Sequence, residues 1–179
     1  MSQTTGYGFA LDKAQPGQKY DLMFDQVDSY AAEGAIPFGR AVTQGTSDEQ
    51  CKLAAAAGTF LGVALFTQAV EQTLAGVAQY VDKSTVSVGR LARAWVDAVG
   101  AVTKEADAYV ITTVGANQGK FTASTSGTLG PVGKFITSGE DEIVVVEVTS
   151  ALRGPQGEQG PQGPQGDPGP QGPQGDPGL

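Results

Sequence analysis

The sequence predicts an all-β head, built as a β-barrel or sandwich, which is trimeric and continues into a collagen-like triple-helical rod. Two observations support this prediction. Short segments rich in Val, Ile, Thr and Phe recur between glycines at roughly eight- to twelve-residue spacing, as in barrels and sandwiches. Glycine then occupies every third position from Gly154 to Gly178. We therefore divide the chain into an extended N-terminal arm (1–35), a β-rich head (36–150) and a collagen-like stalk (151–179).

The arm is polar and rich in turn residues, with a turn expected at Pro16-Gly17. Its apolar residues alternate too weakly to predict core strands, so we expect an extended segment that packs on neighbouring molecules. The scattered apolar side chains of this arm are the candidate contacts with other subunits or with a partner protein: Tyr7, Phe9, Leu11, Tyr20, Leu22 and Phe24.

The head contains a series of short, glycine-bounded segments that favour strands. Gly62 interrupts one of them and predicts a bulge. A helix over LARAWVDAV (91–99) is an alternative to the strand 93–102, but Gly89 and Gly100 bracket it too closely for a good helix. The predicted strand segments are 36–45, 59–70, 80–90, 93–102, 108–115, 119–127, 132–139 and 142–150.

Residues 47–58 are the one segment with clear helix signals. Ser47 is a candidate N-cap, Gln50 completes a capping box three residues later, and Gly58 suits the C-terminal end. The sequence thus includes one short helix, with a strand-connecting loop as the alternative. On such a helix Cys51 would be a small buried apolar residue, because the chain offers no histidine to activate it.

The stalk follows the rule of a collagen triple helix, in which only glycine fits at the crowded axis. A disordered low-complexity tail is the alternative, but such tails rarely keep a strict period of three. The glycines expected at the triple-helix axis are Gly154, Gly157, Gly160, Gly163, Gly166, Gly169, Gly172, Gly175 and Gly178. At about 3 Å per residue the rod would project roughly 75 Å.

A triple helix requires three parallel chains, so the head is expected to be a homotrimer with cyclic three-fold symmetry. So few triplets should be marginally stable alone. A trimeric head would hold three stalks together at millimolar effective concentration and so promote their assembly.

The amino-acid composition argues against most kinds of catalytic, metal-binding and nucleic-acid-binding site. The net charge is −8 without a basic block, which argues against binding to nucleic acid or to anionic membranes. With no histidine and a single cysteine, triads that need histidine, cysteine zinc clusters and intrachain disulfides are excluded. The N-terminus does not resemble a signal peptide and no apolar run is long enough to span a membrane, so we expect assembly in a cytoplasm.

Close carboxylates are the remaining candidates for a catalytic or metal site, but they lie beside glycine and other turn residues and are interpreted as solvated loops. They are Asp48 and Glu49, Glu105 and Asp107, and Glu140, Asp141 and Glu142. We therefore expect no enzymatic activity, no cofactor and no metal.

The order of the motifs resembles the structural cement, or capsid decoration, proteins of tailed bacteriophages. The resemblance covers roughly residues 30–150 and rests on patterns of apolar residues, turns and glycine. The motifs are IPFGRAV, FLGVALF, YVDKSTVSVGRLARAWV, KEADAYV and EIVVVEV. The turn Lys104–Asp107 lacks the glycine of the family pattern, and the collagen-like stalk is an addition to it.

This resemblance implies a barrel-like trimer that binds the major capsid protein on the outer surface of an icosahedral virion, at local three-fold positions. It implies assembly in the host cytoplasm and no active site. The alternative is a tail-fibre or receptor-binding adhesin component that uses the rod as a spacer and touches the host surface weakly through it. An adhesin is expected to have a globular tip beyond the rod, and the sequence shows none up to Leu179. A bacterial surface collagen-like protein and a hydrolase fit less well.

Overall fold

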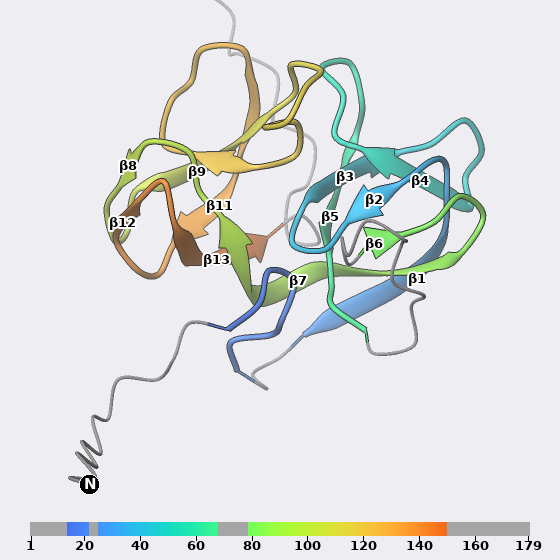
Figure 1. Cartoon of the computed structure of the whole chain (residues 1–179), viewed down its shortest axis with the longest axis horizontal. Coiled ribbons are helices and arrows are strands. Elements are labelled where there is room, and N and C mark those ends of the chain that lie inside the picture. The colour runs from blue at the N-terminus through green and yellow to red at the C-terminus, as the bar shows by residue number, and fades with distance from the viewer. Residues whose placement is uncertain (1–13, 22–24, 68–78, 150–179) are drawn as a thin grey trace, which may run out of the picture.

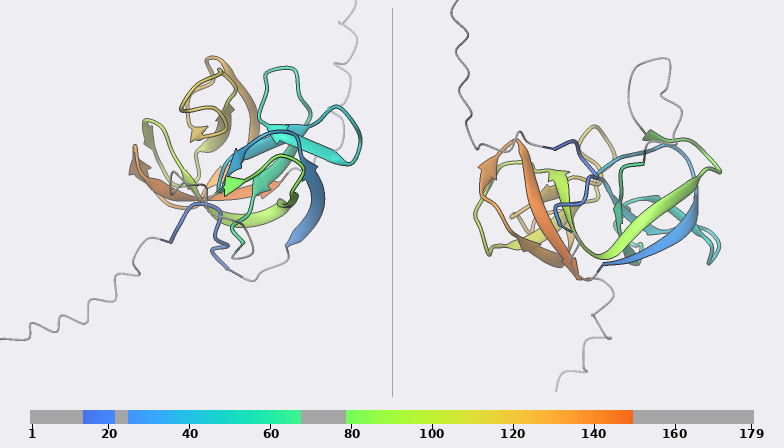
Figure 2. Two further views of the ribbon diagram at one scale, coloured as in Figure 1. Left: turned by 45° about the vertical axis from the view of Figure 1, so that its right-hand side comes forward. Right: turned by 90° about the horizontal axis from the view of Figure 1, so that it is seen from below.

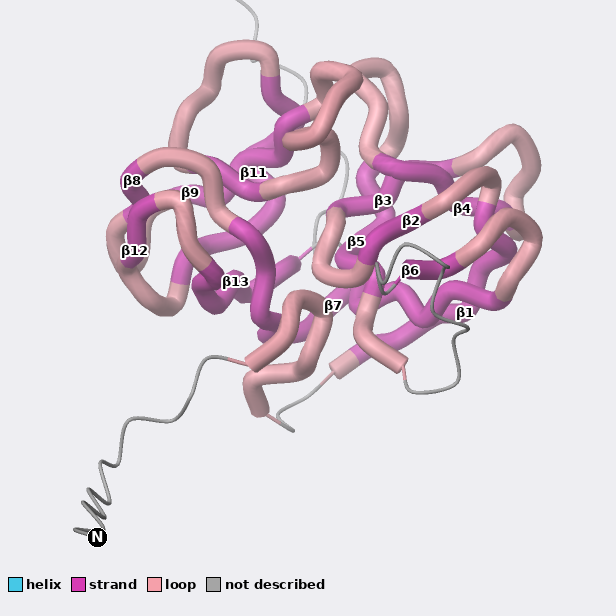
Figure 3. The backbone as a smooth tube through the Cα atoms, viewed as in Figure 1, coloured by secondary structure: helices cyan, strands magenta, loops and turns pink. Residues whose placement is uncertain are grey.

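A computed structural model of the chain describes residues 14–21, 25–67 and 79–149. These residues form strands and loops, which confirms the all-β prediction (Figure 1 and Figure 3). None of them forms a helix long and apolar enough to cross a membrane. The strands are β1 (Gln26–Ala32), β2 (Ile36–Pro37), β3 (Ala41–Gln44), β4 (Gln50–Leu53), β5 (Phe60–Ala64), β6 (Gln79–Tyr80), β7 (Thr85–Asp97), β8 (Ala101–Val102), β9 (Asp107–Ile111), β10 (Phe121–Thr122), β11 (Thr128–Phe135), β12 (Gly139–Glu140) and β13 (Ile143–Thr149).

Five strands close a barrel in the N-terminal half of the head. Strand β1 pairs with β4 and with β7, β4 pairs with β3, β3 with β5, and β5 with β7, so the ring returns to its start. The hydroxyl of Tyr80, a fully buried residue, donates to the carbonyl of Leu65 at 2.7 Å. The apolar core of this barrel consists of Ala32, Ile36, Phe38, Val42, Cys51, Leu61, Ala64, Tyr80, Val86 and Val88.

The long strand β7 leaves this barrel and enters a second, strongly curved lobe. There the strand order is β7–β13–β11–β9–β10. The sheet curls until β10 approaches the end of β7, where Ala98 and Phe121 form a parallel bridge and the Val99 N–H donates to the Phe121 carbonyl at 2.8 Å. Phe121 and Phe135 are the largest side chains of the second core. Figure 2 shows the two lobes joined by β7.

Every predicted strand segment contains a strand, but 80–90 and 93–102 merge into the single strand β7 and extend to β6 and β8. The strand alternative for 93–102 is therefore correct. The predicted bulge at Gly62 is confirmed, because the register of β3 against β5 jumps from Val42–Gly62 to Thr43–Phe60.

The helix predicted at 47–58 is wrong. Its central residues form β4, which pairs with β1 and β3, and Cys51 is fully buried on that strand. The polar residues that imitate a capping box form a turn instead, in which the Gln50 N–H donates to the Ser47 carbonyl at 3.0 Å. An isolated helix of this length is marginal, and pairing on both sides of β4 provides more hydrogen bonds and a buried face.

The extended arm predicted for 1–35 is also wrong in its second half. Residues Gln26–Ala32 form β1 of the barrel. This strand has no clear signal in the sequence, because three of its residues are exposed, three are only partly buried and Ala32 alone is fully buried. Residues 1–13 and the stalk 151–179 lie outside the described residues, so the rod and the trimer remain predictions.

Candidate interaction surface

Of the six candidate contact residues, the structure describes Tyr20; Tyr7, Phe9, Leu11, Leu22 and Phe24 lie outside the described residues. Tyr20 is 43% exposed, and its ring packs edge-on against Trp95 with the centroids 5.7 Å apart. Its backbone N–H donates to the Arg93 carbonyl at 2.8 Å. Tyr20 is thus held against the molecule's own strand β7 and still presents an aromatic edge to the outside.

The segment around Tyr20 pairs alongside one edge of β7 and does not project from the head. Lys19 bridges Ala94 in antiparallel fashion, and the Gly17 N–H donates to the Trp95 carbonyl at 2.7 Å. The Gly17 carbonyl in turn accepts from the N–H of Phe66 at 2.7 Å. A Cβ at Gly17 would lie 2.8 Å from that nitrogen, and the φ of +85° also requires glycine there. The turn predicted at Pro16-Gly17 is therefore present and tightly docked.

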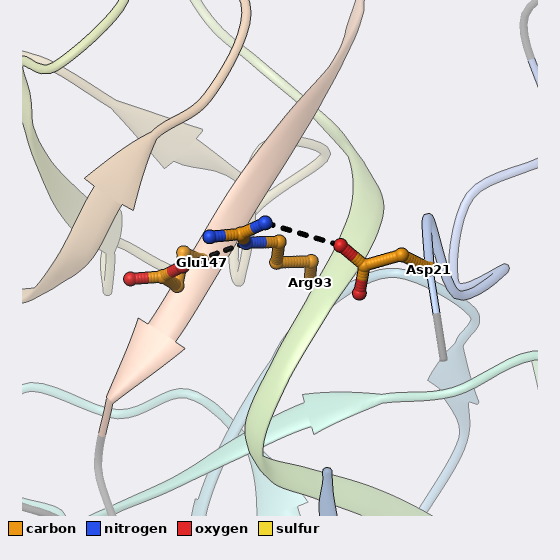
Figure 4. A network of polar contacts seen from close by, with 3 residues as sticks. All are labelled: Asp21, Arg93 and Glu147. Atoms are coloured by element: carbon orange, nitrogen blue, oxygen red, sulfur yellow. Dashed lines mark hydrogen bonds and ion pairs between the residues drawn. The ribbon is translucent and has the colours of Figure 1, made fainter. Parts of the chain in front are cut away.

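A charged network ties this segment to two strands. The Arg93 Nε donates to Glu147 Oε2 on β13 at 2.7 Å, and its Nη1 donates to Asp21 Oδ2 at 3.1 Å (Figure 4). These hydrogen bonds, first to Glu147 and then to Asp21, raise the pKa of Arg93 above its ordinary value. All three side chains are about one-third exposed, so the network fixes geometry more than it adds stability.

The same side of β7 continues into the pairing with β1, where Arg90 and Asp28 form an ion pair at 3.0 Å and Val27 is 38% exposed. We call the surface made by Tyr20, Asp21, Val27, Arg93 and Trp95 the β7 seam. It combines aromatic and apolar side chains with charges that are already paired, a composition typical of protein interfaces.

Sequence reasoning singled out Tyr20, whose role as a contact stays a prediction. It did not identify Trp95 and Arg93 as the residues beside Tyr20, or Glu147 as the partner of Arg93. The alternation of β7 and β13 could have placed Arg93 and Glu147 on the outer face of adjacent strands. Their exact pairing, Arg93 opposite Glu147, follows only from the register.

The described chain begins and ends on opposite sides of the head (Figure 2, right). The Gly17 N–H donates to the Trp95 carbonyl, whereas Thr149, the last described residue, is the register partner of Leu91. These β7 residues are four positions apart, which corresponds to ~13 Å along the strand. The two ends of the described chain therefore lie at different places on the head.

The close carboxylates and Cys51 are the candidate groups for chemistry among the described residues. All of the close carboxylates singled out from the sequence are exposed, and Asp107 forms a surface ion pair with Lys134 at 3.2 Å. Burial raises the pKa of the Cys51 thiol to about 11, so it is protonated and unreactive near neutral pH. Among the described residues no group of three or more potential ligands is placed to hold a metal ion.

Comparisons with known proteins agree with this picture. Residues 2–149 match the family described as "Structural cement protein (E217 gp24/Pam3 gp6)". A search of curated proteins gives no match. Among solved structures, a chain from the capsid of Myoviridae phage XM1 has 18% identity and a TM-score of 0.65, covering 82% of this chain and 97% of its own, and so shares the fold.

A second solved structure, the head fiber gp8.5 N base of bacteriophage phi29, has 13% identity and a TM-score of 0.39, with 71% of this chain and 96% of that chain covered. The family match spans most of the chain and confirms the resemblance drawn from its motifs. The family is structural, in agreement with the expectation of no enzymatic activity. The chain belongs to the phage structural cement protein family and is a component of the virion capsid.

Proposed function

We propose that this protein decorates the outer surface of an icosahedral phage capsid as a homotrimer, binds the major capsid protein through its N-terminal side and projects a collagen-like fibre. The observation that supports this orientation is the separation of the two chain ends on the head. An arm that leaves one side can reach a capsid subunit while the stalk leaves from elsewhere.

The trimer is inferred from the stalk. A single Gly-X-Y chain makes no internal backbone hydrogen bonds, and three chains are needed to place glycine at a common axis. The family assignment supports a head that assembles on a symmetric shell, where a cyclic trimer matches a local three-fold position. Light scattering of the purified protein should give about three times the monomer mass, and a stable monomer at micromolar concentration would contradict the proposal.

The capsid contact is assigned to the arm and the β7 seam, because binding requires apolar anchors with a polar rim. The arm supplies Tyr7, Phe9 and Leu11, and the seam supplies Tyr20 beside Trp95. The Gly-X-Y repeat offers mainly glutamine, proline and three acids, a charge of −9 for three chains, and this favours water over an interface.

The experiment uses undecorated capsids mixed with the full chain, a variant lacking 2–12 and a variant lacking 154–179. The structure sets the first boundary, because a longer deletion would remove Gly17 and β1 from the folded head. We expect the stalk-less protein to decorate capsids normally and the arm-less protein to bind much more weakly, measured by co-sedimentation and electron microscopy. Binding by the arm-less protein together with failure of the stalk-less one would assign the anchor to the rod.

A further inference from the structure

A groove of about 350 Å³ opens where the two lobes meet. Its walls are the start of β5, at Thr59 and Phe60, the segment Leu129–Val132 of β11, and Arg90 of β7. Phe60 and Leu129 also pack, partly buried, against the second core. The groove therefore has a mixed lining, in which apolar side chains continue the core to the surface beside Thr59 and Arg90. Arg90 is paired to Asp28.

The groove lies on the line along which β13 would continue. The last pairs of β13 are Val148 with Gly133 of β11 and Thr149 with Leu91 of β7. The next residues along these two neighbours are Val132 and Arg90, and both line the groove. One position beyond Arg90, at Gly89, β7 is already paired with β5. A chain that continued straight on from Thr149 would therefore enter a space bounded by β11, β5 and β7.

We propose that this groove binds the linker 150–153 of the same chain, with the side chain of Leu152 as its apolar anchor. The linker reads Ser-Ala-Leu-Arg, and Leu152 is the one bulky aliphatic residue between Thr149 and the end of the stalk at Leu179. Three residues span at most ~10 Å, so Leu152 reaches this groove directly from the end of β13. The apolar side chains of the groove are complementary to the apolar side chain of Leu152, which the chain tethers beside them.

The anchor would fix the starting point of the stalk. Gly154, the first glycine of the repeat, follows Leu152 by two residues, so each chain of the proposed trimer would enter the rod from a defined position on its own head. This consequence rests on the proposed trimeric function, whereas the anchoring of Leu152 does not. It would help to align the three chains in one glycine register.

Limited trypsin digestion of the full-length protein tests the anchor, because Arg153 is a cleavage site next to Leu152. Leu152→Ser should raise the rate of cleavage at Arg153 by about tenfold, since it removes the burial of a leucine side chain. Ala151→Ser is the matched control in the same linker and should leave the rate unchanged. Equal rates for Leu152→Ser and the unmodified protein would overturn the proposal, as would a tenfold rise in the control.

Cross-linking identifies the site and the chain that occupies it. Thr59 is exposed, so Thr59→Cys should leave the fold intact, and together with Leu152→Cys it should react with a short bis-maleimide to give a product of single-chain mass. Val81→Cys with Leu152→Cys is the control, because Val81 is exposed on the turn that follows β6, away from the groove, and should give no product. A product between chains, or none from the first pair, overturns the proposal. Light scattering and capsid binding test the trimeric function separately.

Discussion

Arg40, from the IPFGRAV motif, is a side chain of the first barrel that binds a loop of the second lobe. Its Nη1 donates to the carbonyls of Ala116 and Gln118 at 3.1 and 2.8 Å, and its Nε lies 4.0 Å from Asp97 Oδ2. The side chain is only 14% exposed. Burial lowers the pKa of Arg40, and the charge of Asp97 partly offsets that effect.

The stability lost in Arg40→Ala follows from these contacts. A hydrogen bond to a charged group contributes about 1.5–3 kcal/mol, and removing the donor leaves two carbonyls without this partner. The Nε makes no hydrogen bond, and the ion pair with Asp97, which is about one-third exposed, adds little. We therefore expect the loss to lie at the lower end of the range that two such hydrogen bonds would give. We expect Arg40→Ala to lower the free energy of unfolding by about 3 kcal/mol.

Urea unfolding followed by the fluorescence of Trp95, the single tryptophan, provides the assay. Lys134→Ala is the control, because Lys134 pairs with Asp107 where both side chains are about half exposed, and this variant should lose less than about 1 kcal/mol. If Arg40→Ala unfolds within about 0.5 kcal/mol of the unmodified protein, the contact between the lobes does not stabilise the fold and the reasoning is refuted.

Three further predictions concern single positions. Gly62→Ala places a Cβ 2.2 Å from the Gly89 carbonyl oxygen and should lower the free energy of unfolding in urea by about 3 kcal/mol or more. At Gly100 a Cβ meets open space but the φ is +75°, so Gly100→Ala should lower it by about 1 kcal/mol. Hydrogen bonds from the Thr46 N–H and hydroxyl lower the pKa of Glu33 from its ordinary value of 4.5, so the ionised carboxylate stabilises the fold above pH 4.5 and this contribution is lost as the pH falls through the lowered pKa. Glu33→Gln should remove this part of the acid destabilisation, measured as a smaller drop in the urea midpoint between pH 6 and pH 3. Cys51 should react with a thiol reagent at pH 8 at least about a thousandfold more slowly in the folded protein than in urea, and equal rates would contradict its burial in β4.

The strands that could be predicted from the sequence are those with one buried face. In most of β7 alternate valines and alanines are buried, and that period of two is visible without a structure. In β13 the signal is a continuous run of β-branched residues, of which Val144, Val145 and Val146 are all buried. Strand β1 escaped prediction because its pairing with β4 and β7 uses the backbone, while its side chains are mostly polar. Strand β4 was not predicted, because residues that cap helices also form turns. Pairing with β1 and β3 decides between a helix and a turn followed by a strand.

The candidate surface could be predicted only in outline. The aromatic content of the N-terminal segment pointed to contacts, and Tyr20 is indeed exposed, but the segment around it packs on the protein's own β7. Gly17 is required there by the approach of Phe66 and Gly39, residues more than twenty positions away in the sequence. Contacts of this kind form only when the barrel closes, so they cannot be predicted from the sequence of the segment itself.

Strand β7 makes the two lobes one structural unit, because Val88 contributes to the first core and Val96 to the second. This has a mechanical consequence for a stalk attached after Thr149. A pull on the stalk away from the arm would act along β13, whose seven register pairs with β7 run from Ile143–Asp97 to Thr149–Leu91. The backbone hydrogen bonds of an antiparallel ladder lie perpendicular to the strands, so such a pull loads them together and not one after another. Arg93 adds a side-chain link across this ladder to Glu147 and a second link to the N-terminal segment through Asp21. The charged network therefore lies between the two ends of the described chain, where the fibre proposed above would transmit load to the head.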